Sequence, residues 1–370
     1  MLNSLPSAGL LAALALAAPT LAFGQAGAAP APIPQEQLLA TLSANAPLAQ
    51  KWVAAQQLAR LGTPEAVPKL AAWLADDQLA DLARCALEPM PEPAVDDVLR
   101  EALGKLEGRR LAGVITSLGV RRDARAVEPL SKFLRASEAA VASASAAALG
   151  SIGTGPAAQA LQAALPTAPP SLRPEVYAAL IQCAEALRVR DRSAEALEVC
   201  NWIGAAKAPA PFRAAALRGA LLADEGGRLK LLARQLQGED RAMFAAVLGL
   251  VQQELPGVEV TEALAAELGK LPAERQRLLV QALSARGDAA AVAALITASR
   301  SGPDSVRLAA IREMAGNPAF VPVLVELAAQ AEAALAQAAQ DSLANVWVDR
   351  AKAALEGKVD AAPPPPGGGP

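Results

Sequence analysis

Residues 306–316, VRLAAIREMAG, followed at 321–329 by VPVLVELAA, contain the pattern that decides the fold of this chain. Apolar residues in the first segment recur three to four positions apart, as Val306 and Ala310 do, which is the spacing of one helix face. Gly316 stands where helices commonly end. We therefore predict two amphipathic helices joined by a glycine turn. A pair this short cannot bury its own apolar stripe, so it needs neighbours of the same kind.

The rest of the sequence supplies those neighbours at a step of about 31 residues. The later helix pattern of the pair begins at Val67, Val95, Val127, Ala158, Leu229, Val260, Ala291 and Val321. The earlier pattern, usually closed by glycine, reads WVAAQQLARLG (52–62), LAGVITSLG (111–119), SASAAALGSIG (143–153) and LLVQALSARG (278–287). We predict an all-α fold, a right-handed α-α superhelix (an α-solenoid) of nine or ten helix pairs with a convex outer layer and a concave inner layer.

Two short motifs resemble those of a known repeat family. Asp304-Ser305-Val306-Arg307 and the segment 148–153, ALGSIG, are similar to the start and the end of the second helix in HEAT repeats, above all the short bacterial form called PBS-lyase HEAT-like repeats. Arg213 falls at the arginine position of the same motif, and the resemblance extends over 47–345. It implies an α-solenoid of HEAT-like repeats. Members of this family act as scaffolds and binding platforms and, less often, as lyases.

Composition favours helices and excludes several classes of function. The chain is 53% hydrophobic but only 3% aromatic, and about a quarter of it is alanine, which favours helix over strand. It contains no histidine, so Ser-His and Cys-His nucleophile systems are excluded and the commonest zinc ligand is absent. With a net charge of -3 and few aromatic residues, the chain has neither the basic surface nor the stacking platform that nucleic acids need, so we expect no nucleic-acid partner. No motif indicates a catalytic residue, a cofactor or a metal.

The N-terminus has the features of an export signal. Residues 10–23, LLAALALAAPTLAF, form an apolar run too short to span a membrane but suited to the core of a signal peptide. We expect a periplasmic or secreted protein with no integral membrane segment after cleavage. The predicted regions are a signal peptide (1–26), an Ala/Pro-rich linker with the start of the first helix (27–46), an N-terminal HEAT-like array (47–165), a Pro-rich break (166–172), a C-terminal HEAT-like array (173–356) and a disordered Pro/Gly tail (357–370).

Three cysteines occur in a chain whose predicted compartment permits disulfides. Cys183 and Cys200 are placed almost symmetrically about a predicted turn, so a disulfide between them is one possibility. Helix axes usually lie 8–10 Å apart, whereas a disulfide needs Cα atoms within about 7 Å. We therefore expect that Cys85, Cys183 and Cys200 are three buried thiols that act as small hydrophobic side chains.

The candidate binding residues are five arginines and two tryptophans. The arginines flank the predicted inner helix LAGVITSLG, where they could clamp carboxylate or phosphate groups or simply form a solvated edge. They are Arg109, Arg110, Arg121, Arg122 and Arg125. Trp52 and Trp73 lie in successive predicted helices, and we expect them to fill gaps between alanines, with peptide binding as the alternative.

The function that the sequence supports best is an exported, non-catalytic scaffold or protein-binding module that acts through its concave face. One alternative, implied by the family resemblance, is a lyase or isomerase acting on a small cofactor or tetrapyrrole. Another is an accessory module to a separate catalytic or sugar-binding partner. The sequence indicates a protein partner without indicating which one, and it leaves the oligomeric state open.

Overall fold

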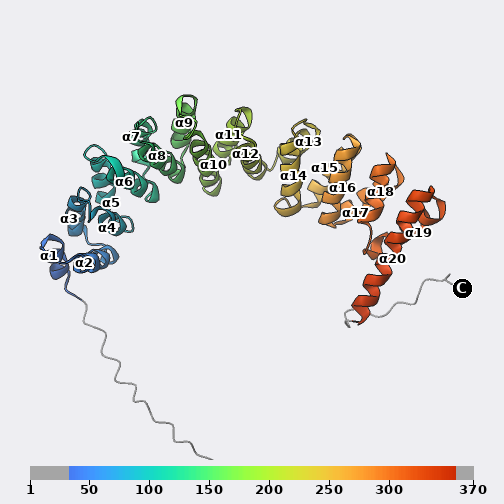
Figure 1. Cartoon of the computed structure of the whole chain (residues 1–370), viewed down its shortest axis with the longest axis horizontal. Helices are drawn as coiled ribbons and strands as arrows, with labels where there is room; N and C mark the ends of the chain where they lie inside the picture. Colours follow the sequence, from blue (N-terminus) through green and yellow to red (C-terminus); the bar gives the residue numbers. More distant parts are fainter. Residues whose placement is uncertain (1–32, 356–370) are drawn as a thin grey trace, which may run out of the picture.

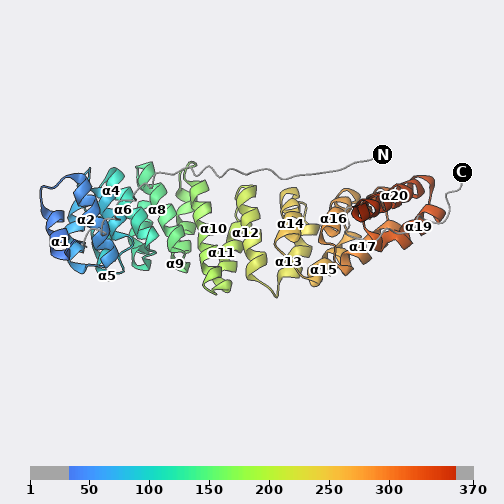
Figure 2. The same cartoon turned by 90° about the horizontal axis from the view of Figure 1, so that it is seen from below.

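The computed structural model describes residues 33–355, which form twenty α-helices, α1 to α20, and four short 3-10 helices. No strand occurs among these residues. The helices follow one another in antiparallel pairs that stack into an arch (Figure 1), and Figure 2 shows the same stack from below. The predicted all-α solenoid is confirmed, and α1 to α20 make ten helix pairs.

The even-numbered helices form one layer, because each packs against the next even-numbered helix from α2 to α20. They are α2 (Leu48–Leu61), α4 (Ala80–Leu87), α6 (Gly108–Val120), α8 (Ala139–Ile152), α10 (Arg173–Val189), α12 (Ala210–Ala223), α14 (Arg241–Gln253), α16 (Ala273–Arg286), α18 (Asp304–Glu313) and α20 (Ala333–Leu355). In the middle of the arch, α8, α10, α12 and α14 lie toward its concave side (Figure 1).

The odd-numbered helices form the second layer, and α7, α9, α11 and α13 lie toward the convex side in Figure 1. They are α1 (Gln35–Ser43), α3 (Val67–Trp73), α5 (Pro93–Ala102), α7 (Val127–Phe133), α9 (Gly155–Ala164), α11 (Ser193–Ala205), α13 (Arg228–Gln237), α15 (Val258–Leu268), α17 (Ala289–Arg300) and α19 (Val321–Gln330). The 3-10 helices are η1 (Pro64–Ala66), η2 (Ala124–Ala126), η3 (Leu165–Thr167) and η4 (Pro318–Phe320).

Left-handed residues close several of the even-numbered helices, as the glycine pattern predicts. Gly62, Gly153 and Gly287 have φ of 63°, 60° and 66° directly after α2, α8 and α16. The prediction is wrong for Gly119, which lies inside α6 and lets that helix approach α8. A Cβ on Gly119 would lie 2.7 Å from the Cα of Ala148. Glycine is needed there for close packing and not for a turn.

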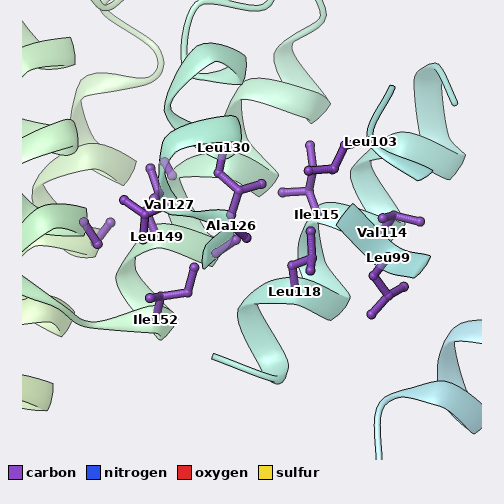
Figure 3. Close-up of a cluster of buried hydrophobic side chains, with 14 of the residues drawn as sticks. Leu99, Leu103, Val114, Ile115, Leu118, Ala126, Val127, Leu130, Leu149 and Ile152 are labelled. Carbon is purple, nitrogen blue, oxygen red and sulfur yellow. The ribbon is translucent and has the colours of Figure 1, made fainter. Parts of the chain in front are cut away.

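Leucine, valine and alanine side chains from both layers fill the space between them. Figure 3 shows one section, in which Leu99 of α5, Ile115 of α6, Leu130 of α7 and Leu149 of α8 are all fully buried. The ten side chains labelled in Figure 3 are all aliphatic, and side chains of different lengths interdigitate. Such packing builds a core in a chain that has few aromatic residues.

Two of the predicted regions flank the N-terminal array. The region 27–46, predicted as a linker with the start of the first helix, contains α1, whose Leu38 and Leu42 are buried in the N-terminal apolar cluster. At the expected break 166–172 the core continues, because Ala168 and Leu172 are buried in the same apolar cluster as residues on both sides. The core divides at α12 instead. The predicted signal peptide (1–26) and tail (357–370) lie outside the described residues.

Candidate functional site

The five arginines grouped by the sequence lie at opposite ends of α6. Arg109 and Arg110 are in its first turn, whereas Arg121, Arg122 and Arg125 follow its last residue. The 13 residues of this helix rise about 20 Å, so the two sets cannot hold the same carboxylate or phosphate. A ligand that contacts all five arginines would therefore have to extend along the whole of α6.

Three of these arginines form exposed ion pairs with the preceding repeat. Arg109 Nη2 lies 2.6 Å from Asp81 Oδ2, and Arg110 Nη1 lies 2.9 Å from Asp77 Oδ1. Arg125 lies 3.4 Å from a third aspartate. Pairs this exposed contribute about 0–1 kcal/mol to the free energy of unfolding. Their charges are already matched within the chain, which weakens the case for a partner at these positions.

Arg121 is part of the structural framework. Its side chain is 10% exposed and forms an ion pair with Asp96. The Nη1 group donates hydrogen bonds to the carbonyl oxygens of Leu87, Glu88 and Met90, at 3.3, 2.9 and 2.6 Å. These carbonyls lie at the C-terminal end of α4, where helix carbonyls lack partners and the helix dipole is negative. Arg121 thus joins two successive repeats and is closed to a ligand.

The same device recurs in two other repeats. Arg190 donates to the carbonyls of Ile152 and Gly153 at the end of α8, at 3.1 and 2.7 Å. The side chain of Arg286 is 7% exposed, and it donates hydrogen bonds to the carbonyl oxygens of Leu255 and Gly257, which follow α14. Each arginine directly precedes a residue with positive φ at the end of an even-numbered helix. The sequence does carry this signal, as Arg-Arg-Asp at 121–123, Arg-Asp-Arg at 190–192 and Arg-Gly-Asp at 286–288, but our sequence analysis missed it.

The tryptophans are built into the N-terminal repeats. Trp73 is 7% exposed and belongs to the apolar core, and the ammonium group of Lys51 lies 5.7 Å from its ring centre. Trp52 is half-buried on α2. Trp73 thus fills space in the core, and Trp52 presents part of its ring to solvent.

The cysteines are free thiols that face different neighbours. Cys183 on α10 lies 3.5 Å from the carbonyl oxygen of Leu149 on α8, whereas Cys200 on α11 lies against Gly219 of α12. A Cβ on Gly219 would come within 2.6 Å of the Cys200 sulfur. Burial raises the pKa of both thiols to about 12. Cys85 is exposed, so the prediction that all three are buried is wrong for that residue.

The layer of even-numbered helices contains a cavity that the sequence did not indicate. It has a volume of about 510 Å³ and lies between α8, α10 and α12. Ala178, Ile181 and Val189 of α10 and Ala215 of α12 give it an apolar wall. Val189 is 67% exposed, although it is a large aliphatic side chain. An exposed apolar wall in a cavity of this size is typical of a binding site.

Charged side chains border this cavity. Glu185 Oε1 lies 2.6 Å from Arg188 Nη2, and Arg218 Nη2 lies 2.5 Å from Glu254 Oε2. The hydrogen bond from Arg188 holds the pKa of Glu185 below its usual value, and the hydrogen bond from Arg218 does the same for Glu254. Glu185 and Glu254 are therefore ionised at neutral pH, and each neutralises the charge of the arginine that it binds. Arg122, which also borders the cavity, forms no ion pair within residues 33–355.

Neither a metal site nor a membrane span is found in the part of the chain that the structure describes. No three His, Cys, Asp or Glu side chains among residues 33–355 are grouped so that they could hold a metal ion. None of the described helices combines the length and the hydropathy that crossing a bilayer requires.

No model of a known protein family matches this chain, and no curated protein matches it. Solved structures similar to it include the karyopherin Kap121p bound to the extreme C-terminus of the protein phosphatase Cdc14p, at 11% identity over 87% of this chain and 43% of that one (TM-score 0.44). Human deoxyhypusine hydroxylase is 21% identical over 78% and 99% (TM-score 0.29). The CpcE–CpcF complex of phycocyanin lyase from Nostoc is 18% identical over 71% and 93% (TM-score 0.29). These similarities concern the fold, and they assign neither a reaction nor a partner to this chain.

Proposed function

We propose that this protein is an exported, non-catalytic scaffold that binds another protein along the concave side of its solenoid. The observation that carries the proposal is the cavity between α8, α10 and α12, which has an apolar wall. These three helices lie toward the concave side at the middle of the arch (Figure 1). Stacked helices offer an extended surface, and extended surfaces suit a segment of another protein. Export rests on the apolar run at residues 10–23.

Site-specific photo-crosslinking tests the proposal with a matched pair of positions. Gln182 is exposed on α10 and borders the cavity, whereas Gln159 is exposed on α9 in the other layer. A photoreactive residue replaces each glutamine in turn in the native host. We expect crosslinked protein partners, identified by mass spectrometry, from position 182 and few or none from position 159.

Two results would contradict the proposal. Equal crosslinking from the two positions would mean that the concave side has no special role. Crosslinking from position 159 alone would place the partner on the convex layer instead. Fractionation of the same host cells tests export separately, because the proposal requires the protein to be outside the cytoplasm.

A further inference from the structure

One turn beside the cavity uses an unfavourable backbone conformation. The residue after an even-numbered helix has positive φ in several repeats, and it is glycine at Gly62, Gly153 and Gly287. Two residues with side chains share this conformation, Arg122 after α6 (φ 54°) and Asp191 after α10 (φ 59°). Aspartate visits the left-handed region more readily than other residues with a Cβ, and arginine has no such advantage. The turn alone would therefore favour glycine or aspartate over arginine at position 122.

The cavity that Arg122 borders has an excess of positive charge. Glu185 and Arg218, two other charged residues of its lining, are each neutralised by a partner outside it. Arg190 donates to two carbonyl oxygens, which orient its guanidinium without pairing it with a carboxylate. Asp191 follows it in the sequence but forms no ion pair with it among the described residues and lies outside the lining. Two cations, Arg122 and Arg190, thus remain without a carboxylate.

The cations stand beside apolar surface. Ile181 and Val189 project from α10 into the same lining as Arg122 and Arg190, and the volume of about 510 Å³ falls within the range of about 300–1,000 Å³ that is usual for binding cavities. Apolar contact and a carboxylate are the two features that would complement this lining.

We propose that this cavity binds an extended, acidic segment of a partner protein, with one aliphatic side chain against Ile181 and Val189 and an adjacent carboxylate paired with Arg122 and Arg190. The inference rests on the proposed function and specifies the chemistry of the partner. It also accounts for the arginine at position 122. The left-handed arginine destabilises the turn, and its positive charge strengthens binding of the acidic segment.

Fluorescence polarisation with labelled nine-residue peptides tests the chemistry on the full-length exported protein. The first probe is Ser-Gly-Ser-Leu-Asp-Glu-Ser-Gly-Ser. The second replaces Asp-Glu with Asn-Gln, and the third replaces Leu with Ala. We expect the first probe to bind at least about tenfold more tightly than either control, and to bind less tightly as the salt concentration rises. Absence of binding by the first probe up to about 1 mM, or equal binding of all three, would overturn the proposal.

The substitution Arg122→Gly separates binding from folding. It removes the cation and relieves the left-handed conformation, so we expect probe affinity to fall about tenfold or more while the unfolding temperature stays the same or rises. Arg125→Ala is the matched control, because Arg125 is exposed on the next turn and does not line the cavity. It should leave the affinity unchanged, and Arg122→Lys should retain most of it. Unchanged affinity in Arg122→Gly would overturn the proposal.

Crosslinking distinguishes a failure of the acidic-segment proposal from a failure of the proposed scaffold function. If position 182 captures a partner with equal yield from wild type and from Arg122→Gly, the scaffold function stands and the acidic-segment proposal is overturned. If position 182 captures no partner, both are overturned.

Discussion

At the scale of single residues, three arginines join successive repeats. Arg121, Arg190 and Arg286 each occupy the last position before a residue of positive φ, and each donates hydrogen bonds to carbonyls that end the preceding even-numbered helix. A guanidinium suits this role because it is planar, always charged and has five donors. The charge also faces the negative end of a helix dipole. Arginine at these positions therefore stabilises the contact between repeats.

We expect Arg286→Met to destabilise the C-terminal repeats by about 2–4 kcal/mol, because it leaves the partly buried carbonyls of Val251 and Leu255 without the donor that Arg286 supplies. Arg277→Met is the control, because Arg277 is exposed on the same helix and forms no ion pair among the described residues. Urea denaturation followed by circular dichroism measures the difference. Equal midpoints for the two variants would show that the carbonyl contacts do not stabilise the fold.

The thiols give a second prediction at this scale. Burial raises the pKa of Cys183 and Cys200 to about 12, and alkylation requires the thiolate, so both should resist iodoacetamide in the folded protein at neutral pH. Exposed Cys85 should react. Intact-mass measurement should therefore find one added group in the native protein and three after denaturation. Three groups on the native protein, or one after denaturation without reductant, would contradict this description of the cysteines.

At the scale of elements, the distance between neighbouring helices depends on small residues at particular positions. Gly119 of α6 faces Ala148 of α8, and a Cβ at Gly119 would lie 2.7 Å from the Cα of that alanine. The obstacle is backbone, which cannot move aside as a flexible side chain can. Gly249 lies inside α14 with nothing within 4 Å of its added Cβ. The same residue type is thus required in one helix and tolerated in the other.

Replacing each of these glycines with alanine should have opposite effects. Alanine raises helix propensity by about 1 kcal/mol at both sites. At Gly119 the overlap with Ala148 dominates, so we expect Gly119→Ala to lower the stability by about 1–3 kcal/mol, and Gly249→Ala to leave it unchanged or raise it. Thermal unfolding monitored at 222 nm, the far-ultraviolet helix band, compares the two. Stabilisation by both substitutions would mean that α6 and α8 do not approach this closely.

At the scale of the whole molecule, α12 is the junction between two cores. Ala216 and Ala220 of α12 belong to the N-terminal apolar cluster, and Leu217 and Leu221 of the same helix belong with the C-terminal one. A cavity of about 600 Å³ separates α11 from α13 on the other side of this helix. The two clusters therefore meet at α12, and Leu231 of α13 packs against both of them.

Truncation tests this arrangement. Residues 33–224 contain the complete N-terminal cluster and should fold cooperatively. Residues 206–355 include α12 and should be more stable than residues 228–355, which lack its two leucines. A cut at residue 168, inside the break predicted from sequence, should destabilise both products because Ala168 and Leu172 are part of a continuous core. Helix content and unfolding midpoints from circular dichroism decide between the two boundaries.

The junction should also respond to pH. Hydrogen bonds from Arg218 keep the pKa of Glu254 below its usual value in the folded state. This carboxylate therefore stabilises the fold at pH values above its unfolded pKa, about 4.3, and the contribution is lost as the pH falls through the lower folded pKa. We expect Glu254→Gln to reduce stability at pH 7 and to have a smaller effect near pH 3, below the unfolded pKa. A constant difference across this range would exclude ionisation of Glu254 as the cause.

The sequence by itself determined the helical class, the repeat length and most of the turns, because helix periodicity and left-handed glycines such as Gly62 and Gly153 are properties of a few consecutive residues. The tertiary structure alone decided which groups meet across about 30 residues of chain. It separated Arg109 from Arg121, placed α12 between two cores, and brought Arg122 to the cavity of α10. The physical reason is that stacking of repeats sets these distances, and the stacking depends on how closely helices approach, as at Gly119.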